Sequence, residues 1–122
     1  MDFGFEKLVV YQLAVDFANK VFLLSKDFSS RVQSSIGDQF RRAVISIANN
    51  IAEGSSKISP REKKQFYSHA LNSTNECIPI MTIANAQGEI SDKDHEDLRE
   101  LCGRLYGMLY KLIKSVDENK TN

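Results

Sequence analysis

The sequence lacks a charge imbalance, a long hydrophobic run and a recognisable export signal. Lysine plus arginine and aspartate plus glutamate each number 16, so the zero net charge removes any bulk attraction to nucleic acid or anionic membranes. No apolar stretch approaches the roughly 20 residues needed to cross a bilayer. The N-terminal residues do not combine a charged start, a long apolar run and a small-residue cleavage site. We therefore expect a cytoplasmic protein with no membrane partner.

Cysteine and histidine are too few and too scattered for cofactor or metal chemistry. Cys77 and Cys102 lie within helical apolar patterns, which favours small core residues over reactive thiols. Neither His69 nor His95 follows a glutamate by three residues, so the pattern of di-iron bundles is absent. The spacings typical of zinc sites and of haem attachment are absent as well. We predict no cofactor, no metal site and no catalytic residue.

Helical periodicity extends over nearly the whole chain. The length of 122 residues fits one domain, residues 1–122, with a frayed tail from about residue 118. Apolar residues recur every three or four positions in four segments joined by short linkers. This arrangement predicts an all-α fold, an antiparallel up-down-up-down four-helix bundle. We expect its helices at about residues 5–27, 34–53, 60–87 and 91–117.

Local signals predict where these helices begin, end and bend. Gly54 and Gly88 follow the second and third segments, and glycine readily adopts the left-handed conformation that closes a helix. The run Ser59-Pro60-Arg61-Glu62 is a capping box with proline at the first helical position. Pro79 falls inside the third helix, where a missing hydrogen bond costs about 3 kcal/mol unless a kink absorbs it. We expect a bend at residues 75–79.

Residues 39–54 carry two apolar faces with a polar seam between them. The first face contains Phe40, Val44, Ile47 and Ile51; the second contains Ile45, Ala48 and Ala52; the seam contains Arg42, Ser46, Asn49 and Glu53. A single bundle core cannot bury both faces, so the pattern indicates assembly. We predict an oligomer interface formed by Ile45, Ala48, Asn49, Ala52 and Glu53.

Two polar residues of this helix invite a more specific interpretation. Core spacing from Phe40 through Ala43 and Ile47 reaches Asn50, where a buried amide must find partners or cost about 1 to 3 kcal/mol. A polar residue at a core position can fix register and oligomer state. Glu53 would similarly reach a neighbouring arginine or a helix N-terminus, or it remains a solvent-exposed capping carboxylate.

The stretch 39–54, the Ser/Lys loop after it, the helix start at Ser59 and the small-polar run 69–76 together resemble one family. It is the bacterial four-helix bundle protein family, first recognised in intervening sequences of 23S ribosomal RNA genes. The similarity begins at Phe5-Glu6-Lys7-Leu8 and covers nearly the whole chain. It implies a homopentameric ring with a central channel and no established biochemical role. A related branch serves diversity-generating retroelements and binds nucleic acid through a strongly basic surface, whereas this chain is neutral.

Two functions stay open. We predict a non-catalytic homo-oligomeric scaffold or binding protein, expected to be a pentamer. The alternative is an RNA- or ribonucleoprotein-associated factor, because residues 31–64 carry seven basic and three acidic side chains. Its symmetric basic surface would comprise Arg41, Arg42, Lys57, Arg61, Lys63 and Lys64. Against it, Arg41 and Arg42 could instead pair with Glu53, Asp38 or a carboxylate of a neighbouring subunit. No aromatic residues interleave with these charges for base stacking.

Overall fold

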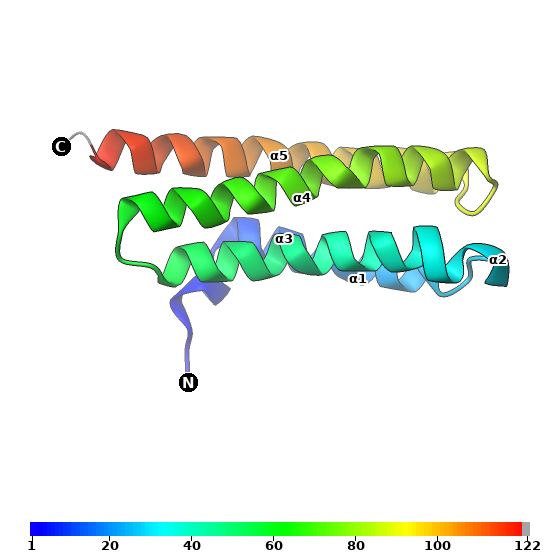
Figure 1. Cartoon of the computed structure of the whole chain (residues 1–122), viewed down its shortest axis with the longest axis horizontal. Coiled ribbons are helices and arrows are strands. Elements are labelled where there is room, and N and C mark those ends of the chain that lie inside the picture. The colour runs from blue at the N-terminus through cyan, green and yellow to red at the C-terminus, as the bar shows by residue number, and fades with distance from the viewer. Residues whose placement is uncertain (121–122) are drawn as a thin grey trace.

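The computed structural model describes residues 1–120, with side chains described through residue 117. Four long helices run antiparallel, and the start of α1 and the end of α5 lie toward the end where α3 connects to α4 (Figure 1). The elements are η1 (Gly4–Lys7), α1 (Val9–Ser25), α2 (Ser30–Val32), the π-helical turn η2 (Gln33–Gly37), α3 (Asp38–Ser56), α4 (Pro60–Ala86) and α5 (Asp92–Lys120).

The helices pack as a four-sided bundle. α3 contacts α1 and α4, and α5 contacts the same two helices from the other side. The described residues contain no strands. The predicted all-α, antiparallel up-down-up-down bundle is therefore confirmed (Figure 1).

The inward face of α3 is the centre of the core. Phe40, Val44, Ile47 and Ile51 are each at most 1% exposed, as their helical spacing predicted. The ring of Phe17 on α1 meets Phe40 edge-on, with 6.4 Å between centroids. Apolar residues of α4 and α5 complete the same cluster. The bundle thus uses one of the two apolar faces of α3 for its own stability.

The first two helices begin later than predicted. α1 starts at Val9, because Leu8 is extended and the residues before it form a short 3-10 turn. α3 starts at Asp38, after α2 and the π-helical turn. The side-chain amide of Gln33 donates hydrogen bonds to the carbonyls of Ser25 (2.8 Å) and Phe28 (3.0 Å), which fixes this connection.

Gly54 does not end α3, so that prediction was wrong. The helix continues to Ser56, and among the described glycines the left-handed conformation occurs only at Gly88, with φ 77°. Gly54 is instead required for packing, since a Cβ atom there would lie 2.6 Å from Cε1 of Tyr67 on α4. The prediction for Gly88 is confirmed, because it directly follows the C-cap of α4.

The predicted start of the third long helix is confirmed. The hydroxyl of Ser59 accepts a hydrogen bond from the backbone N–H of Glu62 (3.4 Å), and Pro60 takes the first helical position. α4 then continues through Pro79 without interruption. Pro79 is exposed, so its ring projects outside the core. The bend expected at residues 75–79 stays a prediction.

The last helix begins as expected and extends further. The hydroxyl of Ser91 accepts a hydrogen bond from the backbone N–H of Asp94 (3.1 Å), which caps α5. The helix runs to Lys120, past the predicted onset of fraying at about residue 118. The rest of that expected tail, residues 121–122, lies outside the described residues.

Glu89 fastens two loops at the end of the bundle opposite the termini. Its carboxylate accepts hydrogen bonds from the backbone N–H (2.7 Å) and the hydroxyl (2.8 Å) of Ser29. These hydrogen bonds lower the pKa of Glu89, and the bond from the backbone N–H has the larger effect. The guanidinium of Arg31, 3.8 Å from the Glu89 carboxylate, lowers this pKa further. The α4–α5 loop is thereby tied to the segment after α1, which lies beside it (Figure 1).

Candidate functional site

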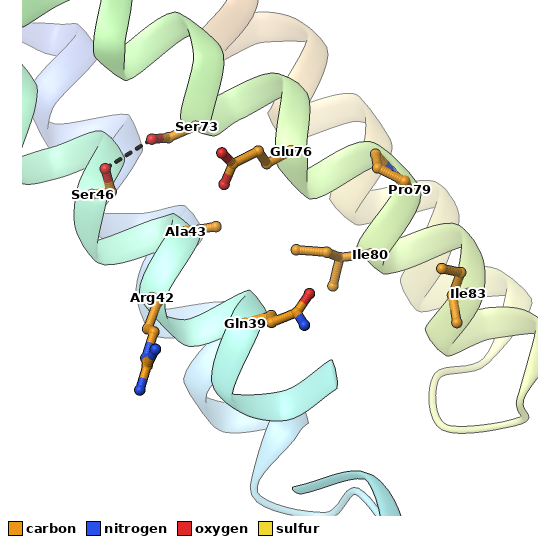
Figure 2. Close-up of a pocket in the computed structure, with 9 residues that line it drawn as sticks. All are labelled: Gln39, Arg42, Ala43, Ser46, Ser73, Glu76, Pro79, Ile80 and Ile83. Atoms are coloured by element: carbon orange, nitrogen blue, oxygen red, sulfur yellow. Dashed lines mark hydrogen bonds between the residues drawn. The ribbon is translucent and has the colours of Figure 1, made fainter. Parts of the chain in front are cut away.

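An open groove of about 590 Å³ lies between α3 and α4. We call it the α3–α4 groove; it is lined by Gln39, Arg42, Ala43, Ser46, Ser73, Glu76, Pro79, Ile80 and Ile83. Figure 2 shows Gln39, Glu76 and Ile80 extending into the space between the helices, while Arg42 points away from Glu76. The groove combines apolar walls with a carboxylate, which suits a protein surface better than a deep ligand pocket.

Small side chains let α3 and α4 approach at one end of this groove. The hydroxyls of Ser46 and Ser73 are hydrogen-bonded across the helices at 2.8 Å (Figure 2). The amide of Asn50 donates to the carbonyl (2.9 Å) and hydroxyl (3.1 Å) of Ser46 on its own helix. Asn50 thus finds partners within the chain, and its role in register stays a prediction.

The outward face of α3 continues the groove. A shallower hollow of about 290 Å³ shares Arg42 and Ser46 with it and adds Ile45, Asn49 and Asn50. Ile45 is 45% exposed, a large apolar surface for a helix centre. We call this hollow and the α3–α4 groove together the α3–α4 face.

The five residues predicted for an interface do not share one environment. Asn49 is exposed, and so is Glu53, which reaches Lys57 on its own helix end at 3.7 Å. Ala48 and Ala52 are half-buried, and Ala48 packs against the core. The accessible part of the predicted interface is therefore the line of Ile45, Asn49 and Glu53.

The guanidinium of Arg41 is directed into the protein. It donates hydrogen bonds to the hydroxyl of Ser25 (3.0 Å), the carbonyl of Gln33 (3.0 Å) and the carboxylate of Asp38 (2.9 Å). These contacts join the end of α1, the π-helical turn and the start of α3. The sequence alternative of pairing with Asp38 describes Arg41 better than an RNA contact does.

Two of the predicted RNA-binding lysines secure the α3–α4 connection. The ammonium of Lys63 donates to the carbonyls of Ser55 (3.0 Å) and Gly54 (3.4 Å), which satisfies the end of α3. Lys57 lies over the ring of Phe66 at 5.2 Å and also pairs with its neighbour Glu53.

The remaining basic residues do not complete a single patch. Lys64 pairs with Asp117 of α5 at 3.0 Å. Arg61 lies close to it in sequence and is exposed, but Arg42 is 15 residues before Lys57, roughly 22 Å along the helix. The structure therefore separates Arg41 and Arg42 from the four basic residues at the α3–α4 connection.

Comparison with known proteins agrees with this architecture. The family model described as "23S rRNA-intervening sequence protein" matches residues 6–111. The chain belongs to this family. A solved structure with a similar fold is a protein of unknown function from the S23 ribosomal protein family of Bacteroides thetaiotaomicron, with a TM-score of 0.80 at 22% identity. The match covers 87% of this chain and 96% of that one. No curated protein matches the chain.

The thiols of this family member are inert core groups. Cys77 donates to the carbonyl of Ser73 and Cys102 to the carbonyl of Thr74, each at 3.4 Å. Burial raises the pKa of both thiols, to about 11 for Cys102. Neither is a nucleophile at neutral pH. In the described part of the chain, no three His, Cys, Asp or Glu side chains gather as a metal site.

A second groove, which sequence reasoning missed, lies between α4 and α5. It measures about 240 Å³ and is lined by Thr74, Asn75, Ile78, Arg99, Cys102, Gly103 and Tyr106. Tyr106 is 42% exposed. The signal in the sequence was the spacing Arg99, Gly103, Tyr106, which places all three on one side of a helix. We call this groove with its exposed Arg99 and Tyr106 the α4–α5 face.

No helix in the described residues is both long and apolar enough to cross a bilayer.

Proposed function

We propose that the protein is a non-catalytic scaffold that assembles with copies of itself through the α3–α4 face, with five chains as the expected number. The observation that supports this proposal is Ile45, which is 45% exposed at the centre of α3 and lines the hollow that continues the α3–α4 groove. Exposed Ile83 lies across the same groove on α4. Covering these residues with another chain removes apolar surface from water.

The surface of the chain is large enough for such contacts. A stable interface buries about 800 Å² on each partner, so two contacts per chain would use about a fifth of the 7279 Å² accessible area. α3 alone, with 19 residues, is about 28 Å long. A side of this bundle can therefore form a standard interface.

The chemistry of the face supports a scaffold over an enzyme. The hydroxyls of Ser46 and Ser73 are bonded to each other, and no histidine lines the groove to activate them. Glu76 is its only carboxylate. General acid–base catalysis needs a convergent set of titratable groups, which the lining of this groove does not offer.

The proposal is tested by measuring mass in solution with native mass spectrometry and light scattering. A pentamer of the 13.8 kDa chain has a mass of about 69 kDa. We expect Ile45→Glu to dissociate the assembly while helix content by circular dichroism stays unchanged. The matched control is Leu23→Glu, since Leu23 is 59% exposed on α1, away from the α3–α4 face.

A wild-type chain that is monomeric at micromolar concentration would refute self-association. Equal dissociation by both variants would refute the α3–α4 face as the contact surface. It would not refute self-association of the wild-type chain.

A further inference from the structure

We infer that the α3–α4 face of one copy receives the α4–α5 face of the next copy, with Glu76 of one chain paired to Arg99 of the other. This inference rests on the proposed self-association and names the surface that fills the groove. It follows from the charges, the heights and the directions of the two faces.

Each groove is lined by an unpaired charge of opposite sign, and the α3–α4 face also holds Arg42, which points away from Glu76 (Figure 2). Glu76 lines the α3–α4 groove and extends into it (Figure 2), and Arg99 lines the α4–α5 groove. Neither side chain forms an ion pair or side-chain hydrogen bond with another residue in the described part of the chain. A carboxylate on one face and a guanidinium on the other are complementary across a contact between copies.

The two faces are also matched in height along the bundle. The Ser46–Ser73 hydrogen bond places α3 and α4 at one level, and the bond from Cys102 to Thr74 places α5 at the same level. One helical turn toward the α4–α5 loop brings Glu76 on α4 and Arg99 on α5 to a second level. Copies related by rotation about an axis parallel to the bundle keep their heights, so such an arrangement brings these two side chains to the same level of the contact.

The same reasoning pairs the rest of the two faces. One turn in the opposite direction, Asn49 on α3 and Tyr106 on α5 share a third level, and Ile45 lies one helical turn from Asn49, at the level of Ser46. A tyrosine ring within one turn of an exposed isoleucine is a favourable centre for an interface. Gly103 lies at the level of the Ser46–Ser73 hydrogen bond. A Cβ atom on Gly103 would meet no atom within 4 Å, so a neighbouring helix can approach closely there.

The directions of the faces lead to a closed ring. α4 borders both grooves, so the faces lie on adjacent sides of a four-sided bundle. Head-to-tail contact between sides about 90° apart turns each copy by about 90° and closes after about four copies, while an angle of about 108° closes after five. A contact between opposite sides would instead build a filament.

The test is a charge exchange. We expect Glu76→Arg and Arg99→Glu each to raise the apparent dissociation constant of the assembly at least about tenfold. The double variant Glu76→Arg/Arg99→Glu should return to within about threefold of wild type, because every contact then holds the reversed pair. The matched control is Arg104→Glu, an exposed arginine of α5 outside the groove, and it should change little.

A cross-linking measurement tests the same contact independently. The double variant Asn49→Cys/Tyr106→Cys should give a ladder of disulfide-linked chains under a mild oxidant, and neither single variant should. Dimers from Asn49→Cys alone would show that two α3–α4 faces meet each other and would overturn the inference. If the wild type assembles but the double charge variant does not regain assembly, the inference is overturned as well. A monomeric wild type would instead refute the proposed scaffold itself.

Discussion

The two faces of α3 differ in how completely the rest of the chain covers them. Toward the core, Phe40, Val44 and Ile47 are covered almost completely by α1, α4 and α5. On the outside, Ile45 is part of the same helix and is 45% exposed. Apolar spacing predicts burial without saying which molecule provides it. The inward face stabilises the fold, and in the proposed assembly the outward face contacts another copy.

The largest expected effect is a substitution on the inward face. Ile47→Ala should lower the free energy of unfolding by about 2 to 5 kcal/mol, because Ile47 is 0% exposed and its truncation leaves a cavity. Ile45→Ala should cost less than about 1 kcal/mol when the protein is diluted to single chains. Urea denaturation at that dilution checks both, and equal losses would break the comparison.

The next largest effect is expected at the end of α3, where Gly54 packs against α4. Gly54→Ala should destabilise by about 1 to 3 kcal/mol, because its methyl group would collide with the ring of Tyr67. The control Gly107→Ala adds a methyl group in open space and should be neutral or stabilising by up to about 1 kcal/mol. Thermal denaturation of the two variants would contradict this assignment if Gly54→Ala were tolerated equally well.

A smaller effect concerns the thiols inside the bundle. The pKa of Cys102 is raised from 9.0 to about 11, so the folded state retains a proton that the unfolded state releases. The contribution to stability is complete below pH 9 and is lost as pH rises toward 11. Denaturation across this range should show a shallower decline for Cys77→Ala/Cys102→Ala than for wild type. An identical decline would mean that the thiols are not protected by folding.

The smallest expected effect is binding of RNA by the outward basic residues. A structured ribosomal RNA fragment should bind weakly and with steep salt dependence, because phosphate neutralisation is the available driving force. Fluorescence anisotropy over a salt titration checks this, with the triple variant Lys57→Ala/Lys63→Ala/Lys64→Ala as the control.

Sub-micromolar affinity near physiological salt that the triple variant abolishes would make RNA binding the preferred function. Salt-insensitive binding would contradict both functions, since the basic residues carry no interleaved aromatic side chains for stacking.

Apolar spacing was sufficient to predict the bundle, because an amphipathic stripe such as Phe40, Val44 and Ile47 fits only one way onto a core. It failed at Gly54, where the need for glycine comes from Tyr67, a residue on another helix. The π-helical turn before α3 was missed for the same reason, since it depends on contacts made by Gln33 and Arg41 with distant carbonyls and hydroxyls.

The candidate site was predicted in part. Ile45 was identified as part of a second apolar face of the helix, and Asn49 as part of the polar seam beside it. Arg99 and Tyr106 were not, because an arginine and a tyrosine on the outer side of a helix look like solvated residues until a groove appears between them. The pair of Lys57 and Glu53 has the i,i+4 spacing of helical ion pairs, whereas the pair of Lys64 and Asp117 joins α4 to α5 and cannot be read from spacing.

The carboxylate of Glu89 has a consequence for how the molecule opens. The contact joins Glu89 to Ser29, 60 positions away, while residues 57–59 join the two helical hairpins covalently at the opposite end. The two hairpins are therefore connected at both ends of the bundle. Local unfolding is expected to begin at the helix ends that carry the chain termini. Amide hydrogen exchange should be slowest in α3 and α4, which are held at both ends, and should quicken toward the first turn of α1 and the last turns of α5.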